Sequence, residues 1–86
     1  MGYYIYIIQS QKNNSYYVGQ TNNIEDRLKR HNSGRSKYTK NKLPWKLVYT
    51  EVFKTRKEAV KREKEIKNKK SRKYIEILIE SKHVGT

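Results

Sequence analysis

The chain opens on the stretch Tyr3-Tyr4-Ile5-Tyr6-Ile7-Ile8, which is followed after a short interval by Tyr16-Tyr17-Val18. The first stretch consists wholly of β-branched and aromatic residues, as is typical of a strand buried on both faces. The interval contains Lys12-Asn13-Asn14-Ser15, whose residue types favour turns. We therefore predict a short antiparallel hairpin whose second strand ends at Gly19.

A helix is predicted directly after the hairpin. Asn22 is suited to cap its N-terminus, and Glu25 three residues later completes a pattern that resembles a capping box. Ile24 and Leu28 supply an apolar stripe that can pack on the sheet. Gly34 is the candidate C-terminal cap. A polar loop then leads to the next strand.

The second half of the chain predicts one strand and two helices. Residues 47–53 form the third strand, and Ser71 caps the last helix. Between them, Thr55 and Glu58 predict the capping box of a helix that runs to about Lys69. The last helix has one apolar side, made of Tyr74, Ile75, Leu78 and Ile79. The order β-β-α-β-α-α predicts an α+β fold, with a small three-stranded antiparallel sheet flanked by helices.

Length and composition exclude several classes of protein. A chain of 86 residues has room for one domain, which we place at residues 1–80, and we expect 81–86 to form a disordered tail. No apolar run approaches the roughly 18 residues that span a membrane, and no basic segment precedes the N-terminal apolar run. We therefore expect a cytoplasmic protein with no membrane partner. With no cysteine and two histidines, disulfides, thiolate sites and multi-histidine zinc sites are excluded.

The charge predicts a polyanionic partner. Lysine and arginine number 21 against 8 acidic residues, which gives a net charge of +13. Residues 54–73 alone carry eleven basic and three acidic side chains. Such a balance is typical of nucleic-acid binders. A ribosome-associated protein and a partly disordered basic chain are the alternatives, but eight tyrosines are more than a disordered chain usually carries.

Four residues of the N-terminal half are candidates for chemistry. Strand pairing brings the neighbourhoods of Tyr6 and Tyr17 together, so that two phenols can meet at one spot. Arg27 and His31 lie four residues apart and share one face of the first helix. The alternatives are aromatic core packing for the tyrosines and a solvated basic face for the helix.

Glu63 is the acid with the most informative position. It lies on the stripe of the second helix that carries Ala59 and Ile66 and that packing should bury. A buried carboxylate is costly unless it is paired or bound to a metal. Glu63 is therefore either a functional acid, an ion-pair partner of Arg27 or of the neighbours of Arg62, or a residue at the edge of the buried stripe.

Together these residues resemble the GIY-YIG endonuclease superfamily over residues 3–79. The resemblance rests on Tyr4-Ile5-Tyr6, Tyr17-Val18-Gly19, Arg27, His31-Asn32-Ser33-Gly34 and Glu63. Tyr4 replaces the glycine of the first motif, and Val18 replaces the isoleucine of the second. The length and the Pro44-Trp45 segment before the third strand resemble the small stand-alone bacterial subfamily, which is itself similar to the nuclease subunit of a structure-selective endonuclease that acts on branched DNA.

The resemblance implies metal-dependent hydrolysis of a phosphodiester, in DNA repair or recombination. Arg27 would stabilise charge on the phosphoryl group, and Glu63 would bind one Mg²⁺ or Mn²⁺ ion. Tyr6 or Tyr17 would orient or deprotonate the attacking water, and His31 would assist proton transfer or phosphate contact. The side chains expected to bind nucleic acid are Arg30, Arg35, Lys37, Lys61, Arg62 and Lys67.

The identity of the partner and the function itself stay open at this point. The partner is expected to be DNA rather than RNA, and a further protein is expected to supply specificity, because so short a chain has little room for a specificity module. A module of the same fold that binds DNA or RNA without cutting is the alternative function. An RNA-associated structural protein that needs no metal is the third reading.

Overall fold

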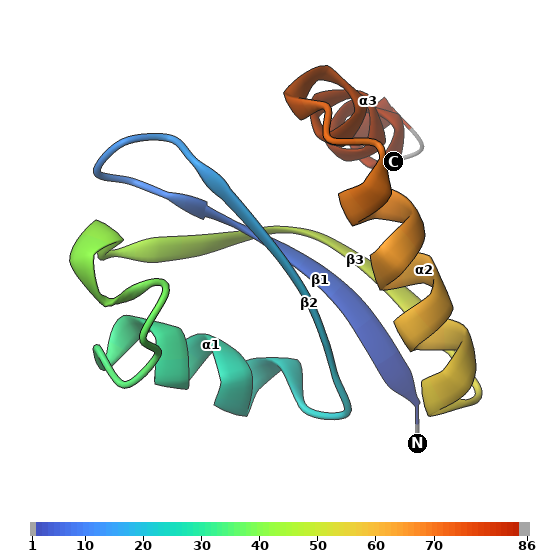
Figure 1. The fold of residues 1–86 in the computed structure, drawn as a ribbon, viewed down its shortest axis with the longest axis horizontal. Helices are drawn as coiled ribbons and strands as arrows, with labels where there is room; N and C mark the ends of the chain where they lie inside the picture. The colour runs from blue at the N-terminus through green and yellow to red at the C-terminus, as the bar shows by residue number, and fades with distance from the viewer. Residues whose placement is uncertain (1, 85–86) are drawn as a thin grey trace.

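The computed structural model describes the backbone of residues 2–84 and the side chains of residues 2–81. One antiparallel sheet has the spatial order β2-β1-β3 and is formed by β1 (Tyr3–Ser10), β2 (Tyr16–Thr21) and β3 (Trp45–Phe53). The helices are α1 (Ile24–Asn32), α2 (Arg56–Asn68) and α3 (Arg72–Val84), and a short 3-10 turn, η1, covers Lys40–Lys42. Figure 1 shows α1 on one side of the sheet and α2 and α3 on the other. The predicted α+β class and the predicted element order are confirmed.

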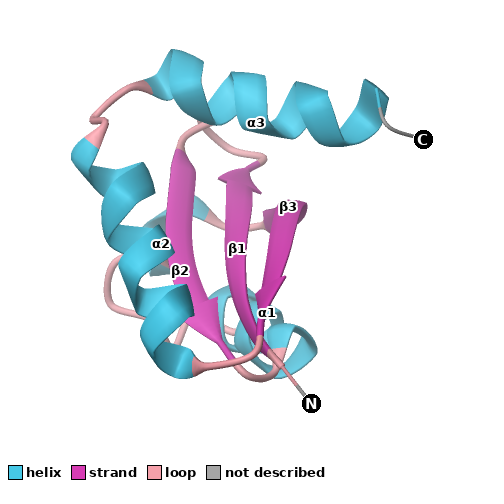
Figure 2. Ribbon diagram, turned by 90° about the vertical axis from the view of Figure 1, so that its right-hand side faces the viewer, coloured by secondary structure: helices cyan, strands magenta, loops and turns pink. Residues whose placement is uncertain are grey.

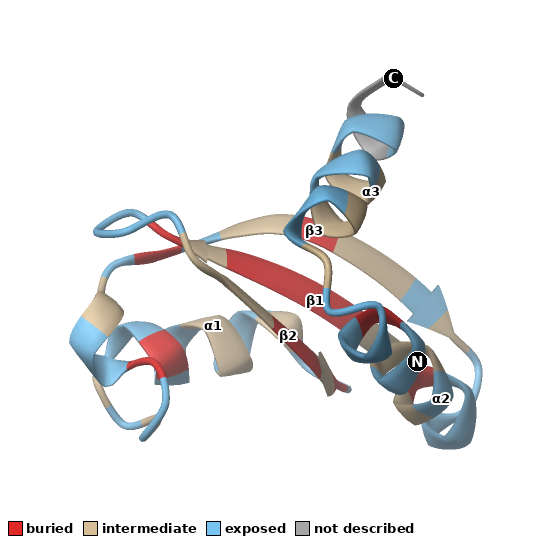
Figure 3. Cartoon of the chain, turned by 45° about the horizontal axis from the view of Figure 1, so that its top comes forward, coloured by how far each residue is buried: buried red, intermediate tan, exposed pale blue. Residues whose placement is uncertain are grey.

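Strand β1 is the centre of the sheet, and its middle is buried on both faces (Figure 3). Ile5 and Ile7 belong to the core cluster that α2 and α3 cover. Tyr6 and Ile8 belong to the cluster that α1 covers. Figure 2 shows β1 between the other two strands, with α2 beside β2. The alternation along β1 thus delivers Tyr6 to the α1 face.

The start of α1 lies one residue later than the sequence predicts. Asn23, not Asn22, caps the helix, and its side-chain oxygen accepts a hydrogen bond from the Asp26 backbone N–H at 3.0 Å. The Thr21 hydroxyl accepts one from the Asn23 N–H at 3.1 Å. Two adjacent asparagines offer the same capping chemistry, so only the path of the chain from β2 decides between them. At the other end, Gly34 has φ +80°, as expected of a C-terminal cap.

The second strand is longer than predicted, and Gly19 does not end it. Strand β2 continues to Thr21, and its register pairs Gly19 with Tyr6. The glycine is therefore an interior strand residue, and its role is close packing rather than a turn.

Helices α2 and α3 begin where the sequence predicts. Thr55 and Glu58 form the complete capping box, and the Ser71 hydroxyl accepts a hydrogen bond from the Tyr74 N–H at 3.1 Å. The predicted apolar side of α3 packs against the core through Tyr74, Ile75, Leu78 and Ile79. Helix α3 continues to Val84, so the tail predicted at 81–86 overlaps the helix, and its last two residues lie outside the described residues. In the part of the chain that the structure describes, no helix has both the length and the hydropathy to cross a bilayer.

An ion pair joins α2 to the sheet. Arg62 donates from Nε and Nη2 to the Glu51 carboxylate at 2.9 and 3.0 Å, and from Nη1 to the Tyr74 hydroxyl at 3.2 Å. The Tyr49 hydroxyl also donates to Glu51. Burial and this hydrogen bond to Glu51 raise the pKa of Tyr49 to about 12. The guanidinium of Arg62 was predicted to contact nucleic acid. In the structure its hydrogen bonds go to Glu51 and Tyr74 and hold α2 against β3 and α3.

This role for Arg62 predicts a contrast with its neighbour Lys61, which is exposed. Both side chains of the Arg62–Glu51 pair are 22% exposed. Arg62→Ala should therefore cost about 1–3 kcal/mol of stability, between the values for surface and buried pairs. Lys61→Ala should cost less than about 0.5 kcal/mol. Thermal unfolding measures both, and equal melting temperatures for the two variants would contradict the structural role of Arg62.

Candidate active site

Gly19 makes room for the ring of Tyr6. A Cβ atom at position 19 would lie 2.5 Å from the Tyr6 hydroxyl oxygen and 2.6 Å from the ring carbon that carries it. Both distances are shorter than any ordinary contact, so the ring lies directly against the backbone of β2. The last glycine of the Tyr17-Val18-Gly19 motif thus positions the tyrosine of the first motif.

We expect Gly19→Ala to displace this ring. Overpacking costs typically about 1–3 kcal/mol of stability. The added methyl also meets ring carbons, so the destabilisation by Gly19→Ala should persist in a Tyr6→Phe background and disappear in a Tyr6→Ala background. Thermal unfolding of the double-mutant cycles measures this coupling. Strictly additive effects of Gly19→Ala and Tyr6→Ala would contradict the contact.

The hydroxyl of Tyr6 is hydrogen-bonded to a buried histidine. His31 Nε2 lies 3.0 Å from the Tyr6 hydroxyl oxygen, and His31 Nδ1 lies 2.9 Å from the Thr39 hydroxyl oxygen. His31 is 2% exposed. The Tyr17 ring packs beside both residues, with centroid distances of 4.9 Å to His31 and 6.3 Å to Tyr6. Two predicted phenols and the predicted histidine therefore meet in one cluster.

The loop after α1 holds the far side of His31. Trp45 is the anchor: its indole N–H donates to the Thr39 carbonyl at 2.9 Å, and its backbone N–H donates to the Asn32 side chain at 2.6 Å. Asn32 donates in return to the Trp45 carbonyl at 3.0 Å. Thr39 and Trp45 are site residues that the sequence interpretation missed. The burial of a threonine in a loop has no local sequence signal, although Asn32 was part of the quoted motif.

The surroundings of Tyr6 and His31 keep both side chains neutral at pH 7. Burial is the main cause that raises the pKa of Tyr6 above that of a free phenol; the neighbouring Tyr17 and Glu63 add to the rise and Arg27 opposes it. Burial also lowers the pKa of His31, and the positive charge of Arg27 lowers it further. Arg27 acts to lower the pKa of the Tyr6 phenol, but burial outweighs this effect. In this state Tyr6 is a neutral phenol and His31 a neutral imidazole at pH 7.

The lowered pKa of His31 predicts how stability depends on pH. An unfolded histidine titrates near pH 6.5, so below that pH the unfolded chain binds a proton that the folded chain resists. Stability should be full above about pH 6.5 and should decrease as the pH falls toward the folded pKa. In His31→Gln the melting temperature, measured by thermal unfolding, should depend less on pH between pH 7.5 and 5.5. His83→Gln, at the other histidine, is the control, and an unchanged slope in His31→Gln would contradict the assignment.

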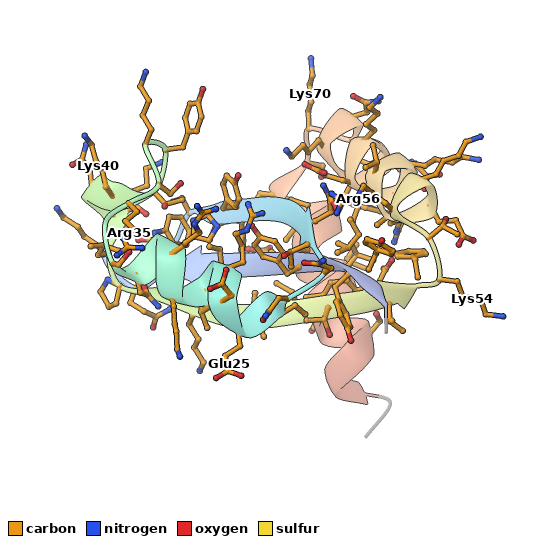
Figure 4. The ribbon with its side chains drawn as sticks, turned by 90° about the horizontal axis from the view of Figure 1, so that it is seen from below. Glu25, Arg35, Lys40, Lys54, Arg56 and Lys70 are labelled. Carbon is orange, nitrogen blue, oxygen red and sulfur yellow. The ribbon has the colours of Figure 1, made fainter. Side chains whose placement is uncertain are left out.

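A pocket of about 250 Å³ opens beside this cluster. Arg27 and Arg30 of α1 and Arg35 of the following loop line it. Figure 4 shows Arg35 beside the C-terminal end of α1. Three guanidinium groups in one pocket suit a phosphate, because each can donate two parallel hydrogen bonds to its oxygens. The remaining lining residues are Tyr17, His31 and Ser36.

Glu63 approaches the cluster from α2. Its carboxylate pairs with Lys67 at 2.6 Å, four residues on, and its side chain is 20% exposed. Ala59 and Ile66 are the buried residues of this helix, so Glu63 lies at the edge of the buried stripe. The Lys67 ammonium in turn lies 5.9 Å from the centroid of the Tyr17 ring. The ion-pair partner that the structure shows is thus Lys67, and not Arg27 or a neighbour of Arg62.

The donor set fits a hard divalent ion that keeps most of its water. Within the described residues there is no group of three or more histidine, cysteine or acidic side chains that could hold a metal. Glu63 is a single carboxylate that acts on the pKa of Tyr6 but does not line the arginine-lined pocket. Mg²⁺ commonly binds through one or two carboxylates, several waters and substrate phosphates. A metal at Glu63 would therefore depend on the substrate to complete its coordination.

The other predicted nucleic-acid contacts are spread over the surface. Lys37 is exposed on the loop that carries Arg35, and Lys61 is exposed on α2. Lys67 is about half exposed and already paired with Glu63. The structure therefore brings Arg30 and Arg35 to the candidate site and leaves Lys37 and Lys61 outside the pocket.

The fold has the β-β-α-β-α-α order, and its tyrosine–histidine cluster beside an arginine-lined pocket contains residues of the motifs by which the sequence resembles the GIY-YIG superfamily. Residues 2–75 match the GIY-YIG catalytic domain family. The chain belongs to this family.

The chain is similar to several bacterial proteins of the UPF0213 group. It is 46% identical over 78 residues to one from Bacillus licheniformis, covering 86% of this chain and 79% of the relative. It is 44% identical over 79 residues to one from Staphylococcus saprophyticus, covering 91% and 95%. The solution NMR structure of the UPF0213 protein BH0048 from Bacillus halodurans aligns with a TM-score of 0.61 at 37% identity, covering 95% of this chain and 86% of that one. None of these names states an activity.

Proposed function

We propose that this chain is an endonuclease that hydrolyses a nucleic-acid phosphodiester with the help of one divalent metal ion, and that it acts on DNA in repair or recombination. The observation that carries the proposal is the meeting of five side chains from four elements. Tyr17, Arg27 and Glu63 are each close enough to Tyr6 to act on its pKa, and His31 is hydrogen-bonded to Tyr6. The elements that supply them are β1, β2, α1 and α2.

The arginine-lined pocket would hold the phosphate that is cleaved. Arg27 lines the pocket and acts on the charge of both Tyr6 and His31, so it lies between the phosphate and the proton-transfer groups. Its role is to stabilise the negative charge that grows on the phosphoryl oxygens as water attacks. Arg30 and Arg35 would orient the substrate by holding the phosphate from the rim.

The tyrosine–histidine cluster would manage the proton of the attacking water. Tyr17 lines the pocket and would orient the water. As the water oxygen bonds to phosphorus, its proton would pass to the Tyr6 hydroxyl, which would give its own proton to His31 Nε2. The bond from phosphorus to the sugar oxygen would break, and that leaving oxygen would take a proton from solvent water. A neutral imidazole and a neutral phenol are the states that this transfer needs. A phenolate base is not required.

Glu63 would hold the metal ion, Mg²⁺ or Mn²⁺. Such an ion, when bound, polarises the phosphate and neutralises charge on the leaving oxygen. Glu63 would give up its pairing with Lys67 for this, which frees the lysine to contact a neighbouring phosphate. An exposed i, i+4 pair of this kind is worth only about 0.2–0.5 kcal/mol, so its exchange costs little.

A cleavage screen tests the proposed function. Linear duplex, single-stranded, flap and four-way DNA, with RNA copies of each, are incubated with Mg²⁺, with Mn²⁺ and with a chelator. We expect metal-dependent cleavage of at least one DNA substrate. Binding to these substrates without cleavage in either metal would contradict the proposal and leave the non-cutting module.

A further inference from the structure

A second cavity shares Tyr17 with the arginine-lined pocket. We call it the β2-edge groove; it has a volume of about 420 Å³ and lies between β2 and the connection of α2 to α3. Val18, Ile66 and Ile75 supply apolar surface in it. Its basic residues are Lys67, Lys70 and Arg72. The proposed mechanism uses none of these except Lys67.

Aromatic faces and cations alternate along this groove. The Arg72 guanidinium lies 4.7 Å from the centroid of the Tyr16 ring, and the Lys67 ammonium lies 5.9 Å from that of Tyr17. Ser71 and Arg72, at the N-terminus of α3, line the groove as well. A helix N-terminus favours anions, and the apolar and aromatic surface favours a flat ring. The groove therefore combines the two chemistries of a nucleotide, a base and its phosphate.

The groove adjoins the candidate active site at Tyr17. Tyr17 lines both cavities, and Lys67 joins the groove to Glu63 through their ion pair. A strand that places one phosphate in the arginine-lined pocket would therefore pass along the groove. Figure 4 shows Lys70 projecting outward from the connection of α2 to α3, away from Lys54 at the other end of α2.

We propose that the β2-edge groove binds one unpaired nucleotide of the substrate strand, with its base on the apolar floor and its phosphate at Lys70 and Arg72. The inference rests on the proposed function for the identity of the strand. A base held in this way cannot stay paired in a duplex, so the proposal also states the substrate class: a nucleic acid with an unpaired nucleotide next to the cleaved phosphate.

The test measures binding in a chelator, where no metal-dependent cleavage takes place. Single strands of one sequence, in DNA and RNA forms, carry the fluorescent base 2-aminopurine at successive positions, and a matched blunt duplex is the comparison. We expect the fluorescence to change on binding at one position and to stay constant in the duplex. The sugar that gives the larger change identifies the strand that the groove accepts. A signal that is independent of position in both sugars would overturn the proposal.

Two variants assign the signal to the groove. Lys70 has φ +47°, a conformation that asparagine tolerates, so Lys70→Asn removes the charge without straining the backbone. Lys54→Asn removes the same charge outside the groove. We expect Lys70→Asn to weaken single-strand binding about fivefold and to reduce the base signal, as the loss of one phosphate contact should. Equal effects of the two substitutions would overturn the proposal, as would displacement of the strand by an extended acidic peptide that binds more tightly.

The two proposals can fail separately. A position-dependent base signal without metal-dependent cleavage of any substrate would leave the groove in place and contradict the nuclease. Cleavage of blunt duplexes at the same rate as substrates with unpaired nucleotides would keep the nuclease and contradict the groove.

Discussion

Arg27→Ala should reduce cleavage about 10²–10³-fold, the usual cost of removing one donor that stabilises the charge of a transition state. Arg27 lines the arginine-lined pocket, and its positive charge acts to lower the pKa of both Tyr6 and His31. Nucleic-acid binding should weaken only slightly, because the rest of the +13 charge remains. Single-turnover cleavage and equilibrium binding measure the two effects on one preparation.

Arg56→Ala is the matched control for this substitution. It removes the same charge from an exposed position at the start of α2, where the guanidinium lies 5.1 Å from the centroid of the Tyr3 ring. We expect it to cleave at nearly the parent rate. If Arg27→Ala kept more than a tenth of the parent rate, or if both variants lost activity equally, Arg27 would have no special place in the site.

Glu63→Gln should abolish cleavage in either metal ion, because the amide keeps the size of the side chain but not the charge that binds the ion. Stability should change by less than about 0.5 kcal/mol, since only an i, i+4 pair with Lys67 is lost. DNA binding without metal should persist or strengthen, because a negative charge near the phosphates has gone. Cleavage, thermal unfolding and binding in chelator are measured together.

Glu65→Gln makes the same chemical change two residues along the helix. Glu65 is 55% exposed and pairs loosely with Arg62 at 4.0 Å. It should cleave like the parent. A melting temperature that drops in Glu63→Gln while cleavage continues would identify Glu63 as a structural residue and remove the metal ligand from the proposal.

The fold was predictable from the sequence because its local signals agree. The wholly apolar run in β1 and the capping box at Thr55 and Glu58 each specify one structure. The errors occur where local chemistry is ambiguous. Asn22 and Asn23 are equivalent as caps, and Gly19 is suited to ending a strand, although the tertiary contact with the Tyr6 ring is what requires it.

The candidate site was predictable only as a set of residues. The spacing of Arg27 and His31 places them on one helix face, but no local pattern states that His31 is buried against Tyr6 or that Thr39 holds its other nitrogen. Arg62 is a residue that the sequence assigned to nucleic-acid binding and that the fold places in a structural contact. In the sequence it is one of many basic residues of its segment, and only the fold brings it to Glu51 and Tyr74. Long-range pairing of this kind is set by topology and not by composition.

The central claim is that metal-dependent hydrolysis of a phosphodiester takes place at this cluster. Its most direct test is the cleavage rate of the parent and of Arg27→Ala, purified in parallel, on a DNA with an unpaired nucleotide, in Mn²⁺ and in chelator. We expect cleavage by the parent in Mn²⁺ only, and cleavage by Arg27→Ala that is at least about a hundredfold slower, as the loss of one charge-stabilising donor requires. Cleavage that continues in chelator, or that the two preparations share equally, would contradict it.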